Sequence, residues 1–237
     1  SPPALVRGKL VLGGWVIDGQ KTGEPSGVMR AFDAVTGDFV WAFDIGRPNR
    51  HGLPPEGQTF TRGSPNSWAP MSSDEALGLI YVPTGNATPD YFGGHRTAND
   101  DRFSSAVVAL DAESGAVRWS FQTTHHDLWD YDVASQPTLV DLPGGTKGLL
   151  QPTKRGEIFF LDRVTGKPIL PVAERPVPQG GVKGERLAKT QPYSIAMPSF
   201  GGPRPTEQRM WGLTPIDQAM CRIRFKEARF DGDMTPL

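Results

Sequence analysis

The sequence predicts an all-β fold made of many short strands and tight turns. Its 237 residues include 28 glycines and 23 prolines, which fall between short apolar runs and not in one low-complexity tract. This distribution is typical of strands joined by turns, because glycine and proline interrupt regular structure. A chain of this length with 37% hydrophobic residues can bury a sizeable core as one domain. A unit that is repeated along the sequence makes this prediction more specific.

The repeated unit consists of a strand, a turn with aspartate and glycine, and a second strand. Its copies lie at 31–37, 109–115 and 160–166, and in the first two a tryptophan, Trp41 or Trp119, follows the glycine by four residues. Aspartate can bond the turn amides, glycine supplies a positive φ, and tryptophan can pack between sheets. The spacing is uneven but compatible with β-propeller blades that carry long loops. One such hairpin per blade is the prediction, and three unrelated hairpins are the alternative.

Three segments depart from this strand pattern. Residues 46–66 are rich in proline, glycine and arginine, and residues 170–205 in proline, glycine and lysine. Both are predicted to be long ordered loops or excursions. After them, Thr214 to Asp217 has the pattern of a capping box with proline at the first helical position, and apolar residues then recur at helical spacing. One amphipathic helix is therefore predicted near 214–230.

Composition excludes several classes of function. The formal net charge is −1, and the 25 basic and 26 acidic residues are mixed along the chain, so nothing indicates a nucleic acid or an anionic membrane surface as the partner. The apolar runs are far shorter than the ~20 residues of a spanning helix. With one cysteine, the chain forms no internal disulfide. The start of the chain has no signal-peptide pattern, so we expect any targeting element outside it. A small molecule is the expected partner.

The densest cluster of reactive groups is His-His-Asp-Leu-Trp-Asp at 125–130, between two strand-like runs. If adjacent strands bring Asp130 and Lys154 to one rim, this pair can move a proton and stabilise a developing negative charge. The paired histidines, His125 and His126, have no third ligand at a familiar spacing, which argues against zinc. We expect them to shape the site.

Three further residues stand in turn-rich contexts. Trp68 lies in Ser-Pro-Asn-Ser-Trp-Ala-Pro, which would present a flat indole; Asn86 ends an apolar strand; and Glu24 lies in Gly-Glu-Pro-Ser-Gly before the first repeat. Taken singly, each candidate also has an ordinary interpretation. An aspartate or asparagine often caps a turn, a lysine is often a surface charge, and a tryptophan is often part of the core.

In combination, three motifs resemble those of the quinoprotein dehydrogenases, which hold pyrroloquinoline quinone (PQQ) at the centre of an eight-bladed propeller. The motifs are Asn-Ser-Trp-Ala-Pro at 66–70, His-His-Asp-Leu-Trp-Asp-Tyr-Asp at 125–132 and Met-Trp-Gly-Leu-Thr-Pro at 210–215. The resemblance is closest to the membrane-bound branch acting on glucose, quinate or shikimate, and residues 197–203 favour its quinate/shikimate members. It covers 1–237, which we expect to be about half of the family's propeller, so only part of the site is expected here.

The resemblance implies roles for individual residues. Asp130 matches the catalytic base, which takes the hydroxyl proton while the hydride passes to the quinone. Lys154 matches the residue that hydrogen-bonds the quinone oxygens, Trp68 matches the aromatic floor under the cofactor, and His126 is expected beside the cofactor.

The resemblance also implies a metal and a reaction. Asn86 and Glu24 match oxygen ligands of a Ca²⁺ or Mg²⁺ ion that also binds the cofactor. The implied function is PQQ-dependent oxidation of a secondary hydroxyl of quinate or shikimate at the periplasmic face of the inner membrane, with electrons passed to ubiquinone and the anchor outside this chain. PQQ-dependent glucose oxidation is the near alternative. A non-catalytic propeller scaffold with the same tryptophan repeats is the alternative of another class.

Overall fold

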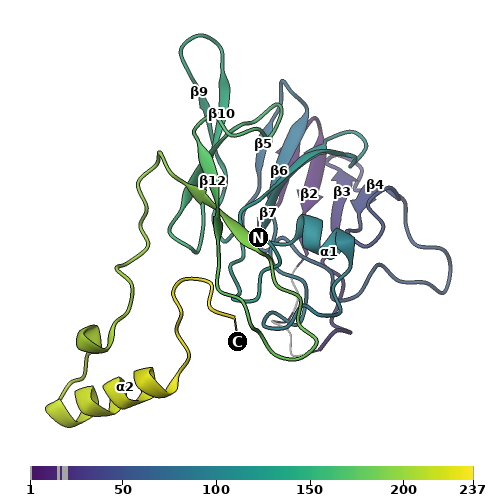
Figure 1. Cartoon of the computed structure of the whole chain (residues 1–237). Helices are drawn as coiled ribbons and strands as arrows, with labels where there is room; N and C mark the ends of the chain where they lie inside the picture. Colours follow the sequence, from purple (N-terminus) through teal and green to yellow (C-terminus); the bar gives the residue numbers. More distant parts are fainter. Residues whose placement is uncertain (1, 15–16, 18–20, 237) are drawn as a thin grey trace.

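Antiparallel sheets built from short strands form the body of the computed structural model, which describes residues 2–14, 17 and 21–236 (Figure 1). Two sheets have four strands each, and in both the order of strands in the sheet follows the order in the chain. The first contains β1 (Ala4–Val6), β2 (Lys9–Leu12), β3 (Met29–Asp33) and β4 (Phe39–Phe43). The second contains β5 (Ser72–Asp74), β6 (Leu79–Pro83), β7 (Ala106–Asp111) and β8 (Val117–Gln122). These are up-and-down sheets of the propeller-blade type, so the all-β prediction is confirmed.

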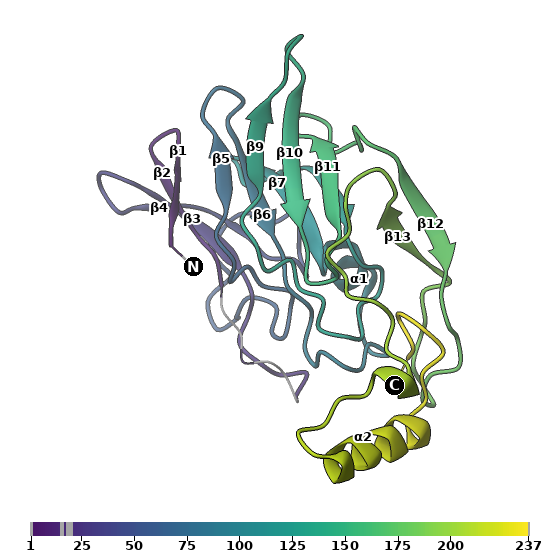
Figure 2. The same ribbon diagram turned by 90° about the vertical axis from the view of Figure 1, so that its left-hand side faces the viewer.

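Two smaller sheets follow along the chain. A three-stranded sheet contains β9 (Thr138–Asp141), β10 (Lys147–Pro152) and β11 (Ile158–Asp162). The hairpin of β12 (Val172–Pro176) and β13 (Thr190–Ser194) lies within the predicted excursion at 170–205, which is therefore more regular than expected. Figure 2 shows the sheets side by side in chain order.

The tryptophans dock each sheet on the next one. Trp41 Nε1 donates to the Ala112 carbonyl oxygen at 2.9 Å, and Trp119 Nε1 donates to the Arg163 carbonyl oxygen at 3.1 Å. Both acceptors lie in the turn of the following repeat. The repeat therefore supplies an indole from one sheet and a receiving turn from its neighbour.

The receiving turns need glycine for two reasons. Gly115 and Gly166 have positive φ values of 72° and 73°. A Cβ atom at Gly115 would stand 2.7 Å from the Trp41 ring, and one at Gly166 would stand 2.6 Å from the Trp119 ring. Any larger residue would therefore displace the docked indole.

Aspartate caps these turns as predicted. Asp33 Oδ1 accepts hydrogen bonds from the backbone N–H groups of Val35 and Thr36, both at 2.9 Å. These amide donors lower the pKa of Asp33. Asp111 and Asp162 bond the amides of their own turns in the same way.

The second sheet is buried on both faces, because alternate residues of a strand point to opposite sides. Ile80 and Val82 of β6 belong to the apolar cluster shared with the first sheet. Leu79 and Tyr81 belong to the cluster shared with the three-stranded sheet. The core thus consists of two apolar layers between successive sheets.

Two α-helices accompany the sheets. The sequence analysis missed α1 (Ala98–Phe103), which begins with a capping box between Thr97 and Asp100. The predicted C-terminal helix is present as α2 (Pro215–Glu227), preceded by a single 3₁₀ turn, η1 (Glu207–Arg209). In the part of the chain that the structure describes, neither helix is long and apolar enough to cross a membrane.

Helix α2 begins as its sequence predicts but packs differently from a core helix. Thr214 and Asp217 form the capping box, with Pro215 in the first turn. The helix lies apart from the sheets (Figure 2). Its apolar residues at helical spacing are exposed, namely Ile216, Met220 and Ile223.

The contact between Gly115 and the Trp41 indole predicts that a substitution at Gly115 destabilises the fold. Gly115→Ala and Gly37→Ala both force alanine into positive φ, at a cost of about 1 kcal/mol. Only Gly115→Ala also meets an indole, because no atom lies within 4 Å of a Cβ at Gly37. We expect Gly115→Ala to lower the free energy of unfolding by about 2 kcal/mol more than the control, measured by urea denaturation of the full-length protein. Equal losses would show that Trp41 does not depend on this glycine.

Candidate functional site

A buried carboxylate shapes the loop that follows β8. Asp127 Oδ2 accepts from the Ser105 hydroxyl at 2.6 Å and from the Tyr131 N–H at 2.7 Å, and its Oδ1 accepts from the Trp129 N–H at 2.9 Å. The two amides flank Asp130, whose φ of +61° is uncommon for a residue other than glycine. Asp127 therefore fixes the backbone from which the Asp130 side chain extends.

Burial dominates the titration of Asp127. The side chain is fully buried, which raises its pKa to about 6 although Ser105 and the Trp129 amide favour the charged form. The negative charge of Asp132 raises this pKa further, and the positive charge of Arg96 lowers it.

The structure brings Asp130 and Lys154 together from two different loops. Lys154 Nζ lies 3.2 Å from Asp130 Oδ2 and donates to the Asp130 carbonyl oxygen at 3.0 Å. Lys154 follows β10, whereas Asp130 follows β8. Both side chains are about one third exposed, so a small molecule can reach them.

Trp68 lies beside this pair. Lys154 Nζ is 5.6 Å from the centroid of the Trp68 ring, within the range of a cation–π contact. The indole is half-buried, and its Nε1 donates to Asp132 Oδ2 at 2.8 Å. Three of the predicted site residues therefore form one group.

Lys154 keeps its proton in this setting. Burial by itself would lower its pKa, but the carboxylates of Asp132 and Asp130 outweigh that effect, and the pKa is raised. An ammonium group thus stands between an accessible carboxylate and an indole face.

Asn86 is anchored at the same place. Its backbone N–H donates to Asp132 Oδ1 at 2.7 Å, and its Nδ2 donates to the carbonyl oxygens of Asp90 and Asp127. This orients the amide and leaves Oδ1, which accepts from the Ala87 N–H, as the oxygen that can also bind a cation.

The oxygen atoms near Asn86 provide only part of the coordination that a hard cation such as Ca²⁺ or Mg²⁺ needs. Beside Asn86, the buried Asn66 Oδ1 has no hydrogen-bond partner among the described residues. Glu24 is held through its backbone: its carbonyl oxygen accepts from Gly63 N–H, and Gly63 in turn accepts from Thr88 N–H. Within the described residues, no group of three histidine, cysteine or acidic side chains is arranged to hold a metal. Metal binding by Asn86 and Glu24 therefore stays a prediction.

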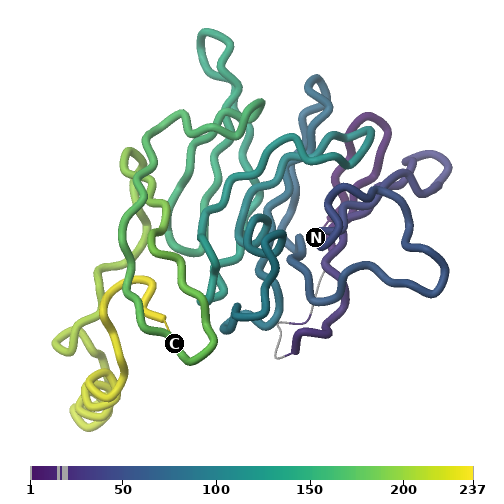
Figure 3. The backbone as a smooth tube through the Cα atoms, turned by 45° about the vertical axis from the view of Figure 1, so that its right-hand side comes forward, coloured from purple at the N-terminus to yellow at the C-terminus, as the bar shows by residue number. Residues whose placement is uncertain are grey.

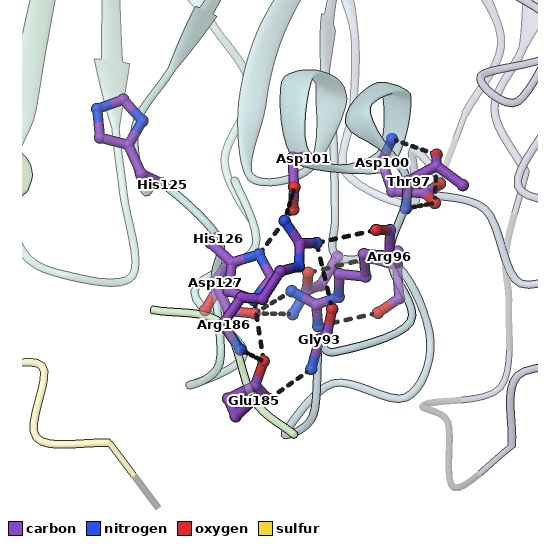
Figure 4. Close-up of polar contacts among 12 residues, drawn as sticks. Gly93, Arg96, Thr97, Asp100, Asp101, His125, His126, Asp127, Glu185 and Arg186 are labelled. Atoms are coloured by element: carbon purple, nitrogen blue, oxygen red, sulfur yellow. Dashed lines mark hydrogen bonds and ion pairs between the residues drawn. The ribbon is translucent and has the colours of Figure 1, made fainter. Parts of the chain in front are cut away.

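His126 belongs to a different set of contacts (Figure 4). Its Nδ1 lies 2.7 Å from Asp101 Oδ1, and its Nε2 lies 3.1 Å from Glu185 Oε1. Arg186 also donates to Asp101, at 2.9 Å. These contacts fasten the excursion between β12 and β13 to α1. Both ring nitrogens are engaged here, and the contact of His126 with a cofactor stays a prediction.

His125 points away from that cluster (Figure 4). Its Nε2 lies 3.0 Å from Glu174 Oε1 on β12, and its Nδ1 lies 2.9 Å from Gln122 Oε1. The two histidines thus connect neighbouring segments of the chain.

Comparison with known proteins identifies the family. The model of the PQQ glucose/ethanol/alcohol dehydrogenase β-propeller domain matches residues 1–237. The chain belongs to this quinoprotein family. The quinoprotein chain is 51% identical, over its whole length, to the glycerol dehydrogenase large subunit of Gluconobacter oxydans, and it covers 32% of that protein. It is 43% identical over 98% of its length to the quinate/shikimate dehydrogenase (quinone) of Acinetobacter baylyi, of which it covers 29%.

A solved structure supports the fold of the quinoprotein chain. The quinohemoprotein alcohol dehydrogenase of Pseudomonas putida superposes with a TM-score of 0.55 at 31% identity, covering 72% of this chain and 28% of that one. The chain therefore spans about a third of the length of these relatives.

Sequence reasoning missed Asp132 in the quinoprotein chain. Its carboxylate contacts Trp68, Asn86 and Lys154, yet the sequence analysis named only the aspartate two residues earlier. The available signal was only that the motif at 125–132 ends in this further aspartate.

The buried Asp127 predicts a pH-dependent stability. Its pKa in the folded protein is above the usual 3.8, so its contribution is greatest below about pH 4 and is lost as the pH rises through about 6. We expect the unfolding free energy of the wild type, relative to Asp127→Asn, to fall by about 2 kcal/mol between pH 4 and 7. Urea denaturation at successive pH values measures this difference. A difference that does not change with pH would show that Asp127 has an ordinary pKa.

Proposed function

We propose that the protein containing this chain is a PQQ-dependent dehydrogenase that oxidises a secondary hydroxyl group of a polyol or cyclitol acid. The observation that carries the proposal is the accessible Asp130–Lys154 pair beside the Trp68 indole, in a chain of this family. PQQ, when bound, supplies the quinone that accepts the hydride.

The chain's own residues have distinct tasks in this proposal. Asp130 accepts the proton of the substrate hydroxyl, for which its carboxylate must be ionised and reachable. Lys154 donates hydrogen bonds to the oxygen on which negative charge develops, and its raised pKa keeps it protonated for this task. The half-buried indole of Trp68 offers a rigid apolar surface for a planar ring system. Asn86 Oδ1 and Glu24 would hold Ca²⁺ or Mg²⁺.

Similarity supports an open-chain polyol as the first substrate candidate. The identity is 51% to the glycerol dehydrogenase subunit, 45% to the quinoprotein glucose dehydrogenase of Escherichia coli and 43% to the quinate/shikimate dehydrogenase. Among substrates with a secondary hydroxyl, quinate or shikimate is the second candidate, and glucose is the alternative substrate. Ubiquinone as electron acceptor and a position at the periplasmic face of the inner membrane belong to the same proposal.

Replacement of the proposed base tests the reaction. We expect Asp130→Asn in the full-length enzyme to reduce turnover with a dye acceptor by about 10²- to 10⁴-fold, because the amide cannot take the proton. PQQ affinity, measured by fluorescence titration, should change little. The control Asp38→Asn removes an exposed turn aspartate and should leave turnover intact. Unchanged turnover in Asp130→Asn would remove Asp130 as the base, and a protein that binds no PQQ would support the scaffold alternative.

A substrate panel tests the specificity. With PQQ and Ca²⁺ or Mg²⁺ added, we expect kcat/KM for glycerol to exceed that for quinate, shikimate and glucose by at least about tenfold, a ratio that pocket contacts can supply. Dye reduction by the full-length enzyme measures each value. A preference for quinate or shikimate would favour the second candidate, and a preference for glucose would exclude both.

A further inference from the structure

We propose that Asp132 is the positioning residue of this site, because its carboxylate holds the Trp68 indole, the Asn86 backbone and the Lys154 ammonium in one fixed arrangement. This inference rests on the proposed PQQ site. Asp132 would touch neither PQQ nor the substrate hydroxyl and would act through the three groups that it contacts.

The contacts of Asp132 come from three separate segments. Oδ2 accepts from Trp68 Nε1 at 2.8 Å and lies 3.5 Å from Lys154 Nζ, and Oδ1 accepts from Asn86 N–H at 2.7 Å. Trp68 precedes β5, Asn86 follows β6, and Lys154 follows β10. The Asp132 side chain therefore sets the relative positions of the Trp68 indole, the Lys154 ammonium and the proposed metal ligand Asn86.

Burial separates the role of Asp132 from that of Asp130. The Asp132 side chain is 7% exposed and that of Asp130 is 32% exposed, although both lie within 3.5 Å of Lys154 Nζ. A buried carboxylate attracts the ammonium with little screening by solvent. Asp132 therefore holds Lys154 in place, and Asp130 stays accessible to a substrate hydroxyl.

Close packing keeps the Asp132 carboxylate from turning. A Cβ atom at Gly85 would stand 3.1 Å from Asp132 Oδ1 and 3.2 Å from Asn66 Oδ1. The carboxylate thus lies against the Gly85 backbone, which is itself fixed by a hydrogen bond from Gly85 N–H to the Asn66 carbonyl oxygen at 2.8 Å. An alanine at position 85 would require the carboxylate to move by a few tenths of an ångström.

The first test replaces the charge and keeps the shape. Asp132→Asn is compared with Glu207→Gln, which removes an exposed carboxylate 3.1 Å from Lys226 Nζ. The pH dependence of acetic anhydride labelling of Lys154, read by peptide mass spectrometry on the PQQ-free full-length protein, reports how strongly the ammonium is held. We expect the midpoint for Lys154 to fall by about one pH unit in Asp132→Asn and to stay unchanged in Glu207→Gln.

The second test measures the affinity of the protein for PQQ. We expect Asp132→Asn to weaken PQQ binding at least about tenfold in a fluorescence titration, because Trp68 and Lys154 lose their common anchor. Turnover of the variant with saturating PQQ should fall less than that of Asp130→Asn. An unchanged Lys154 midpoint together with unchanged PQQ affinity would overturn the positioning role.

If Asp132→Asn does not fold, two glycine substitutions, Gly85→Ala and Gly52→Ala, test the inference in its place. Gly85→Ala pushes on the carboxylate, whereas Gly52→Ala meets no atom within 4 Å. We expect only Gly85→Ala to shift the Lys154 midpoint downward, and equal midpoints in the two variants would contradict the inference. Lys154 labelling needs no PQQ. A shifted midpoint in a protein that never binds PQQ would thus refute the proposed function and leave the anchoring of Lys154 by Asp132 intact.

Discussion

The contact between a tryptophan of one sheet and the glycine turn of the next sets the architecture of this chain. It combines a large buried aromatic area with a directed N–H···O=C bond, so it fixes both the distance and the orientation between neighbouring sheets. Because successive sheets are related in the same way, corresponding strand ends meet at one edge. Figure 3 shows short hairpin turns at the upper edge of β5–β6 and β9–β10, with the long connections below them.

That regularity explains how distant residues meet in the site. In an up-and-down sheet, even-numbered strands end at the edge where odd-numbered strands begin. Asn86 follows β6, Asp130 and Asp132 follow β8, Lys154 follows β10, and Trp68 precedes β5. All five are therefore delivered to the same edge. Three carboxylates of one loop then differ by environment: Asp127 is buried among its own loop amides, Asp132 is buried among groups from other segments, and Asp130 is accessible.

The sequence was sufficient to predict the structural features that depend on local sequence pattern. Turn chemistry and spacing were sufficient for the repeats and for α2. The pairing of Asp130 with Lys154 was predicted only on the condition that adjacent strands meet at one rim, and their roles came from the family resemblance. The role of Asp132 was not predictable in this way, because it depends on hydrogen bonds between segments far apart in the chain. The same holds for His126, whose two carboxylate partners come from α1 and from the excursion after β12. A short strand pair such as β12–β13 also carries little periodic signal in a segment rich in proline and glycine.

The central claim is that Asp130, Lys154 and Trp68 form one wall of a PQQ site and that Asp132 holds this wall in place. A crystal structure of the full-length enzyme with bound PQQ tests it most directly. The account predicts that the PQQ ring lies against the Trp68 indole, that Lys154 Nζ is within hydrogen-bond distance of the cofactor, and that Asp132 keeps its bonds to Trp68 and Asn86. PQQ bound elsewhere, or Trp68 and Lys154 covered by other parts of the protein, would contradict it.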